Sequence, residues 1–283
     1  MYKERHAWYF LTVPALLLLT FSLIPAVWAL ALSFTNYNVF QPVEWVGFDN
    51  FIRAFQDDKF VKAIVNTFYY WLLATPALVV LPVFVAVLVN QKIPLIHFFR
   101  MTYYFPFLVS VVVTALLWKM MFREEGIMNY LLSLVGMEPV GWLTDSNTAM
   151  PSLGLITIWQ GVGYYMLIYL AGLQAIPKDL YEAAEIDGAG FWRKQVYVTF
   201  PMLRTVIFFV AVVSTLSAFK EFTLMMVMTE GGPLYATTTV VYLVYEEAFQ
   251  GLDMGYASAI SFILFAIILV ITLMNRRFFE RET

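Results

Sequence analysis

Tyr181-Glu-Ala-Ala-Glu-Ile-Asp-Gly-Ala-Gly-Phe-Trp-Arg-Lys-Gln-Val-Tyr-Val-Thr-Phe-Pro201 is a charged segment that separates two long apolar runs. The whole chain of 283 residues is 61% apolar and only 13% charged. Soluble domains average roughly 45–50% apolar and about 25% charged residues. The composition therefore predicts an integral membrane protein, in which this segment is a solvent-exposed connection between two membrane spans.

Six apolar stretches are long enough to cross a bilayer. A helix needs about 20 residues, at a rise of about 1.5 Å per residue, to cross a hydrocarbon core of about 30 Å. The stretches cover residues 8–32, 68–89, 101–121, 153–176, 205–228 and 257–274. The period-two alternation of a membrane barrel is absent, so we predict an all-α membrane protein, a six-helix bundle in a single domain, 1–283. The first stretch exceeds the apolar core of a signal peptide, and we expect it to be retained.

Positively charged residues lie mainly on one side of these six spans. If the spans alternate in direction, both termini, residues 90–100 and residues 174–204 share one face. That face carries eleven basic residues and the opposite face five. Because Lys and Arg are enriched in cytoplasmic segments, we predict cytoplasmic termini and a cytoplasmic loop at 177–201. The eleven are Lys3, Arg5, Lys92, Arg100, Lys178, Arg193, Lys194, Arg204, Arg276, Arg277 and Arg281; the five are Arg53, Lys59, Lys62, Lys119 and Arg123.

Proline and glycine predict local bends and turns along these spans. Pro76 and Pro82 favour kinks in the second span, because proline lacks the amide and its ring clashes with the preceding turn. Gly231-Gly232-Pro233 is a turn signal that should end the fifth helix, and residues 239–249 then fit a short surface helix. The aromatic residues of the outer loops anchor the protein at the membrane interface or dock a partner.

Two stripes of polar and small residues mark the fourth and fifth spans. Polar groups in lipid face the bundle interior or a watery cavity, so we predict that the two stripes line a transport pathway. The alternative is that small residues and hydroxyls only mediate helix packing, and that Lys220 reaches the interface by snorkelling. The stripe of the fourth span holds Thr157, Gln160, Gly161 and Tyr164; that of the fifth holds Ser214, Ser217 and Glu221, with Lys220 beside it.

Enzymatic chemistry has no support in the sequence. The chain has no cysteine and two histidines, which disfavours disulfides, cysteine nucleophiles and a histidine metal cluster. Phosphate-loop, zinc-protease and nucleophile-elbow motifs are absent, and no basic patch suggests nucleic-acid binding. We expect no catalytic residue, metal or cofactor in this chain. Gly161-Val-Gly163 is explained best by close helix packing or bending.

The charged segment itself predicts two helices with a bend between them. Pro177 suits a helix start, residues 178–187 favour helix, and Gly188 interrupts them before a second amphipathic stretch at 191–200. The hairpin either rests on the membrane interface through Phe191 and Trp192 or docks a soluble partner. The small side chains of Ala183 and Ala184 favour docking, because they let a partner approach closely.

This segment closely resembles the EAA loop of binding-protein-dependent ABC importer permeases, whose pattern is E-A-A-x3-G-x9-I-x-L-P. Glu182-Ala183-Ala184, Gly188 and Val198-Thr-Phe200-Pro201 match it, with Val198 and Phe200 as conservative replacements. The resemblance extends over the chain to Val46-Gly-Phe-Asp-Asn-Phe51, Thr229-Glu-Gly-Gly-Pro233, Tyr245-Glu-Glu-Ala-Phe249 and Gly255-Tyr-Ala-Ser-Ala259. These later features are similar to carbohydrate permeases of the maltose and glycerol-3-phosphate type, in the subunit that carries the Gly-Gly-Pro turn.

The resemblance implies a division of labour. A cytoplasmic ATPase dimer, which binds ATP and Mg²⁺, would receive the coupling residues Glu182, Ala183, Ala184, Asp187 and Gly188. A second homologous permease would complete the pore, and an extracytoplasmic solute-binding protein would dock on the outer loops. The chain would then import a sugar or oligosaccharide through a prokaryotic cytoplasmic membrane and contact lipid, but no nucleic acid.

Other functions remain open at this point. The same machinery could carry glycerol-3-phosphate, a polyamine or another polar solute, although Lys220 is the one basic residue on the predicted pathway. An ion-driven secondary transporter would work alone, but no inverted repeat supports it. A membrane scaffold would give the polar stripes no function.

Overall fold

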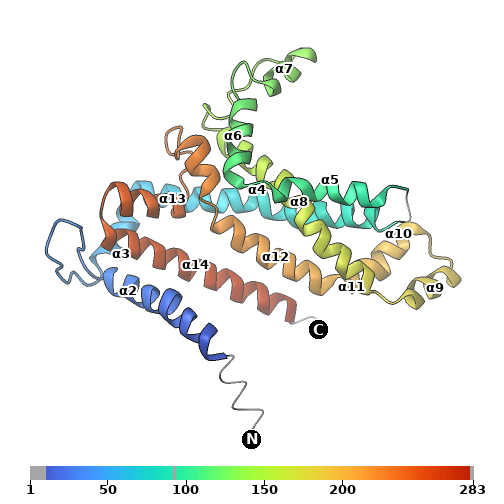
Figure 1. Cartoon of the computed structure of the whole chain (residues 1–283), viewed down its shortest axis with the longest axis horizontal. Coiled ribbons are helices and arrows are strands. Elements are labelled where there is room, and N and C mark those ends of the chain that lie inside the picture. The colour runs from blue at the N-terminus through green and yellow to red at the C-terminus, as the bar shows by residue number, and fades with distance from the viewer. Residues whose placement is uncertain (1–10, 92–93, 281–283) are drawn as a thin grey trace, which may run out of the picture. The chain divides into compact units, whose positions relative to one another are not determined.

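The computed structural model describes residues 11–91 and 94–280, with side chains described up to Asn275. These residues form helices and two isolated bridges but no β-strand (Figure 1), which confirms the predicted all-α class. Wider π turns are labelled η. The elements are η1 Leu19–Leu23, α2 Ile24–Leu32, α3 Asp49–Gln56, α4 Asp58–Val89, α5 Ile96–Leu108, α6 Val111–Met121, α7 Ile127–Leu134, α8 Ala149–Ala175, α9 Lys178–Ile186, α10 Phe191–Lys194, η2 Gln195–Thr199, α11 Phe200–Met202, α12 Arg204–Phe219, η3 Met225–Thr229, α13 Val240–Tyr245, η4 Glu246–Gln250 and α14 Met254–Glu280.

Part of the predicted orientation falls outside this description. Residues 1–10, with Lys3 and Arg5, are not described, and neither are Lys92 and Arg281 or the side chains of Arg276 and Arg277. The assignment of one face to the cytoplasm therefore stays a prediction.

In the part of the chain that the structure describes, four helices are each long and apolar enough to cross a membrane. They are Leu11–Leu32, Asp58–Val89, Ala149–Ala175 and Met254–Asn275. They overlap the first, second, fourth and sixth predicted spans, although α4 begins at Asp58 rather than at residue 68. Pro76 and Pro82 lie inside α4 without ending it. Two further pairs of helices, α5 with α6 and Phe191–Met202 with α12, bring the number of spans to six if each bent pair is counted as one.

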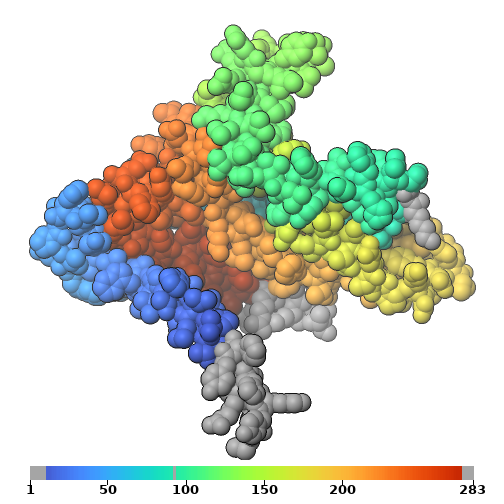
Figure 2. Space-filling view, in the orientation of Figure 1, coloured from blue at the N-terminus to red at the C-terminus, as the bar shows by residue number. Residues whose placement is uncertain are grey.

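The third predicted span, 101–121, is not a single helix. α5 and α6 meet at an angle of 93°, because Val109 and Ser110 between them adopt extended backbone angles. Pro106 was the one local sign of this break, since proline weakens the helical hydrogen bonds around it. Figures 1 and 2 show α6 and α7 projecting from the end of α5.

The fifth predicted span, 205–228, is also interrupted. α12 ends at Phe219, and a second short helical segment that includes η3 begins after Phe222. The carboxylate of Glu221 accepts a hydrogen bond from the amide of Leu224 at 3.0 Å. The first amides of a helix have no partner inside it, so a carboxylate there is stabilising. The expectation that Lys220 and Glu221 lie within one continuous helix is therefore wrong.

The chain divides into two compact units. The first comprises Met1–Val61 with Val240–Ile267 and is joined by two ion pairs, Arg53 to Asp253 at 2.6 Å and Lys59 to Glu246 at 2.7 Å. Ion pairs that remain in contact with solvent, as the side chain of Arg53 is, contribute only about 0–1 kcal/mol each. Close packing therefore matters more here, and a Cβ at Gly255 would overlap the carbonyl oxygen of Thr35.

The second unit comprises Lys62–Thr239 with Ile268–Thr283, and its core lies between α4, α8 and α12. α8 packs against both α5 and α12. Tyr169 of α8 is fully buried and donates its hydroxyl to the carbonyl oxygen of Val79 in α4 at 3.0 Å. Buried polar groups of this kind need partners, so this bond fixes the position of α8 along α4.

Two glycines of α8 have different surroundings. A Cβ at Gly163 would overlap the carbonyl oxygen of Tyr103, so α5 approaches α8 backbone to backbone at this point. A Cβ at Gly154 would meet only the side chain of Leu73, at an ordinary contact distance of 3.5 Å. The interpretation of Gly161-Val-Gly163 as a site of close helix packing is therefore confirmed.

Gly163→Ala should destabilise the protein because the new methyl group has to push α5 away from α8. The cost should be about 1–3 kcal/mol, as for other overpacked cores. Gly154→Ala in the same helix is the matched control and should stabilise the protein by about 0.5–1 kcal/mol, because alanine favours helix. Thermal unfolding of the purified chain in detergent measures both changes. Equal shifts in melting temperature would contradict the close approach of α5.

Candidate functional site

The charged loop is built as helix, bend, helix, and Gly188 makes the bend. α9 ends after Ile186, and Gly188 has a positive φ of +75°. The amide of Gly188 bonds the carbonyl of Glu185 at 3.0 Å, and the amide of Ala189 bonds the carbonyl of Ala184 at 2.8 Å. These two bonds form a Schellman motif, in which the residue with positive φ is usually glycine. The four-residue spacing from Ala184 to Gly188 therefore places glycine at the position where the Schellman motif ends α9.

Side-chain bonds hold the two halves of the loop together. The ammonium group of Lys194 pairs with the carboxylate of Glu185 at 2.6 Å. The hydroxyl of Tyr181 in α9 hydrogen-bonds the hydroxyl of Thr199 in η2 at 3.0 Å. Because the bonds join different points of the hairpin, α9 can move as one piece with the chain that follows it.

The outer side of this hairpin is exposed. Among the predicted coupling residues, Glu182, Ala183, Asp187 and Gly188 are exposed and Ala184 is half-buried. Ile186, at the end of α9, is 88% exposed. Only two residues, Ile176 and Pro177, separate α8 from α9. The loop therefore presents a small, partly apolar helix that is joined almost directly to a core helix.

The polar stripe of α8 is largely occupied by neighbouring helices. The hydroxyl of Thr157 bonds the hydroxyl of Tyr70 in α4. Gly161 faces Leu78 of α4, where a Cβ would come within 2.7 Å of a methyl group. Tyr164 stacks on Phe107, with ring centroids 4.4 Å apart. These contacts favour the packing alternative for this stripe.

Gln160 has a specific structural role in the bent α5–α6 pair. Its side chain is buried, and its amide donates to the carbonyl oxygens of Val109 at 3.1 Å and Pro106 at 3.4 Å. Both carbonyls lie at the end of α5, where a helix leaves its last carbonyls without helical partners; that of Pro106 also accepts from the amide of Val109 at 3.3 Å. Gln160 therefore compensates for the break in α5–α6 from a different helix.

The stripe of α12 divides into a buried and an exposed part. Ser214 is fully buried and donates to the carbonyl of Val210, 2.7 Å away in its own helix. Ser217 is exposed and lies beside the hydroxyl of Tyr165 in α8. Lys220 is also exposed, and its ammonium group has no partner among the residues that the structure describes. Ser217 and Lys220 are thus the exposed members of this stripe, whereas Ser214 is enclosed by its own helix and its neighbours.

Two tyrosines that the sequence analysis did not identify bring the stripes together. Tyr70 is buried, bonds Thr157 and lies within electrostatic reach of Glu221. Tyr165 lies between Tyr164 and Ser217. Both are large aromatic residues within apolar runs, and in such a sequence they give no signal beyond ordinary core packing.

Comparison with known protein families places most of the chain in one group. Residues 51–282 match the family described as binding-protein-dependent transport system inner membrane component. The matched part contains the charged loop, in which we predict the coupling residues, and both polar stripes.

Individual relatives cover nearly the whole chain. It is 35% identical to the probable ABC transporter permease protein YesP of Bacillus subtilis, over 96% of this chain and 89% of that protein. The arabinooligosaccharides transport system permease protein AraP of Halalkalibacterium halodurans is 36% identical, over 89% and 80% respectively. The sn-glycerol-3-phosphate transport system permease protein UgpA of Pectobacterium atrosepticum is 34% identical, over 98% and 96%.

The fold agrees with these relatives. A chain of a bacterial ABC transporter involved in the import of the acidic polysaccharide alginate superposes with a TM-score of 0.88 at 25% identity, covering 99% of this chain and 97% of that one. The same fold occurs in a bacterial alginate ABC transporter in complex with a periplasmic protein that holds an alginate pentasaccharide. The chain belongs to the family of binding-protein-dependent transport system inner membrane components.

Proposed function

We propose that this chain is a membrane-spanning permease subunit of an ATP-driven importer for a sugar or oligosaccharide. A separate cytoplasmic ATPase dimer binds ATP and Mg²⁺, and this chain carries no cofactor of its own. A second homologous permease completes the pore, and an extracytoplasmic binding protein delivers the solute. The assembly works in the cytoplasmic membrane of a prokaryote, with both termini of this chain on the ATPase side.

The observation that carries this proposal is the construction of α9. It is short and exposed, it is closed at Gly188 by paired backbone bonds, and only two residues separate it from α8. Residues Glu182 to Gly188 form its docking face for the ATPase. Because the Lys194–Glu185 and Tyr181–Thr199 bonds hold the hairpin together, a displacement of α9 reaches α8 at one end and α12 at the other.

Movement of α8 would be passed on to α5 and α4. Gln160 and Gly163 hold the backbone of α5 against α8, and Tyr169 and Thr157 bond α4. Packed elements move as units because protein interiors are dense and have few alternative packings. ATP-driven closure of the ATPase dimer would therefore shift the helices that bear the polar stripes.

The exposed Ser217 and Lys220 are the parts of those stripes that support a solute pathway. A hydroxyl can donate and accept, and an ammonium group donates three hydrogen bonds, which suits the hydroxyl groups of a sugar. The names of the relatives AraP and the alginate transporter support a saccharide as the solute.

Glycerol-3-phosphate is the second candidate solute, and the relative UgpA supports it. A phosphate ester requires cationic partners on the pathway, and Lys220 is the candidate. Uptake assays with cells that express the complete importer separate the two solutes. If the importer carries a saccharide, unlabelled saccharides should inhibit uptake and glycerol-3-phosphate should not; if it carries glycerol-3-phosphate, the reverse is expected.

Gly188→Val should uncouple ATP hydrolysis from transport while the protein still inserts in the membrane. An L-residue at positive φ costs roughly 1–2 kcal/mol, and a β-branched one would open the bend after α9. We expect sugar uptake to fall about tenfold, the factor that about 1.4 kcal/mol represents. Uptake and sugar-stimulated ATP hydrolysis of the assembled importer are the two measurements.

Gly190→Val is the matched control for this variant. A Cβ at either glycine has no neighbouring atom within 4 Å, but Gly190 has an ordinary φ of −70°. The control should keep normal uptake and ATP hydrolysis. If the two variants behave alike, the bend at Gly188 has no part in coupling.

The absence of cysteine from the chain allows a direct test of the pathway. Ser217→Cys should react with a membrane-impermeant thiol reagent, because only a thiol in contact with water forms the reactive thiolate. The transported sugar should slow this reaction. Ser214→Cys, three residues away and buried, should not react. Equal labelling of the two variants, or labelling of Ser217→Cys that sugar leaves unchanged, would remove Ser217 from the pathway.

A further inference from the structure

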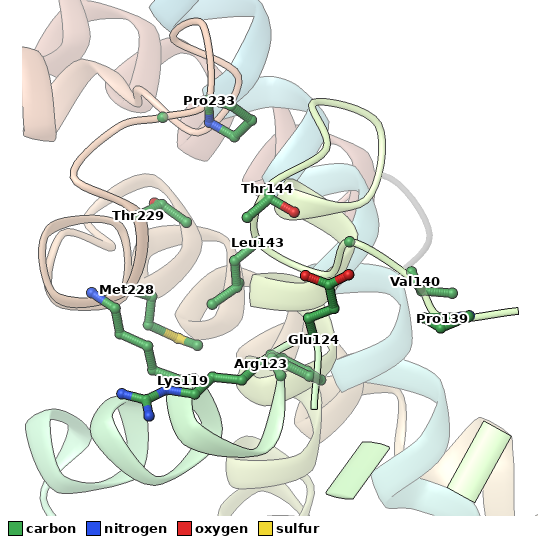
Figure 3. A pocket seen from close by; sticks show the side chains of 13 residues that line it. Lys119, Arg123, Glu124, Pro139, Val140, Leu143, Thr144, Met228, Thr229 and Pro233 are labelled. Atoms are coloured by element: carbon green, nitrogen blue, oxygen red, sulfur yellow. The ribbon is translucent and has the colours of Figure 1, made fainter. Parts of the chain in front are cut away.

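A cavity of about 710 Å³ lies between three segments of the second unit. Its walls come from the end of α6 and the turn after it, from the loop at residues 139–144, and from the turn at residues 228–233 (Figure 3). Small-molecule sites usually measure about 300–1,000 Å³. The cavity lies at the end of α8 away from the coupling loop, which is the face that we predict to be outside the cell.

A buried asparagine holds one wall of the cavity in place. Asn129 of α7 donates to the carbonyl oxygens of Glu124 and Val140, both at 3.1 Å, and accepts from the amide of Val140 at 3.0 Å. It also accepts from the indole nitrogen of Trp142 at 2.9 Å. A side chain that makes this many bonds fixes the loop before any ligand arrives.

Contacts between aromatic rings and a hydrogen bond between α6 and η3 hold the other walls in place. Phe122 stacks on Trp142, with ring centroids 5.1 Å apart. The ammonium group of Lys119 donates to the carbonyl of Val227 at 2.9 Å, which joins α6 to η3. The cavity is therefore pre-formed, and a ligand would bind without the cost of ordering its walls.

Several polar groups on the walls are left without protein partners. The side chains of Arg123 and Glu124 are exposed and make no ion pair or hydrogen bond within the described residues, and the hydroxyl of Thr144 is likewise unbonded there. Lys119 uses one of its three donors. Figure 3 shows Lys119 and Arg123 on one side of the cavity and Glu124 near Thr144.

This lining combines donors, an acceptor and apolar surface. Arg123 and Lys119 can only donate, and ionised Glu124 can only accept. A simple anion would face the carboxylate, and a simple cation would face two positive charges. Hydroxyl groups both donate and accept, so a ring with several hydroxyls satisfies both kinds of group at once. Leu143, Met228 and Pro233 offer the apolar surface that the C–H face of such a ring would cover.

We propose that this cavity is a saccharide-binding subsite on the outer face of the protein, with Arg123 and Glu124 as its main hydrogen-bonding residues. The subsite rests on the proposed function in sugar import. Neither Ser217 nor Lys220 lines it, and it would hold a sugar before the sugar enters the pathway between the spans. A short arm of a binding protein is the competing occupant, and the experiment separates the two.

Saturation-transfer NMR on the purified full chain in lipid nanodiscs tests the subsite, with lactose, arabinotriose and trigalacturonate as probes. At least one probe should bind saturably without any binding protein present. Arg123→Gln and Glu124→Gln should each weaken that binding about tenfold, because a hydrogen bond to a charged group contributes roughly that factor. Inorganic phosphate at the same concentration should not displace the sugar.

Glu125→Gln is the matched control, because Glu125 is exposed, is next in the chain and does not line the cavity. It should bind the probe as the parent chain does, and thermal unfolding confirms that all variants fold. The subsite is wrong if no probe binds, if Glu124→Gln matches Glu125→Gln, or if phosphate displaces the sugar. It is also wrong if the variants bind sugar normally but lose affinity for the purified binding protein.

An experiment can contradict the proposed subsite without contradicting the proposed function, and the two results are distinguishable. If no probe binds to the cavity while sugar uptake still depends on this chain, only the subsite is wrong. If cells that lack the chain take up every sugar at the normal rate, the proposed function in sugar import is wrong.

Discussion

Every break in a helix within an apolar bundle leaves backbone groups that need a hydrogen-bond partner. In lipid no water can supply it, and each unsatisfied group costs several kcal/mol. Over residues 11–91 and 94–280, two of the predicted spans contain such a break, and at each break one polar side chain bonds the backbone. Gln160 reaches from α8 to the end of α5, and Glu221 accepts from the amide of Leu224. These two side chains stabilise the bent helices by satisfying backbone groups at the breaks.

Gln160 and Glu221 show that a polar side chain in a membrane span of this protein can serve the structure of the helices rather than the passage of a solute. On the sequence alone, Gln160 and Glu221 suggest a solute pathway, since polar groups in spans are costly and often functional. In the structure their hydrogen-bonding capacity is used largely by the backbone. The exposed polar groups near the end of α12 are Ser217, which lies beside the hydroxyl of Tyr165, and Lys220, whose ammonium group has no partner among the described residues. A search for solute-contacting residues should therefore begin with side chains whose hydrogen bonds are not already made by the protein.

Much of the fold could be predicted from the sequence. Composition and apolar run lengths indicate the membrane class and the approximate spans, and the spacing from Glu182 to Gly188 indicates a short helix followed by a bend. The break between α5 and α6 could not be placed from Pro106 alone, because the side chain that stabilises it comes from another helix, and the break at Lys220–Phe222 lies in a run without glycine or proline to mark it. Val109 is bonded by Gln160, which lies 51 residues away. Tyr70 and Asn129 were missed for the same reason: their partners lie on other helices or loops.

Gly188 illustrates a different constraint from that at Gly163. At Gly163 a side chain is excluded by the backbone of α5, whereas a Cβ at Gly188 would meet nothing within 4 Å. The constraint at Gly188 is instead its backbone conformation. Its φ of +75° is close to the mirror image of ordinary helical backbone, which is unfavourable for an L-amino acid with a side chain. A D-amino acid would fit this position without strain. The direction in which the loop leaves α9 thus depends on one achiral residue, which adopts this backbone without the steric cost that residues such as Leu95 and Glu230 bear at positive φ elsewhere in the chain.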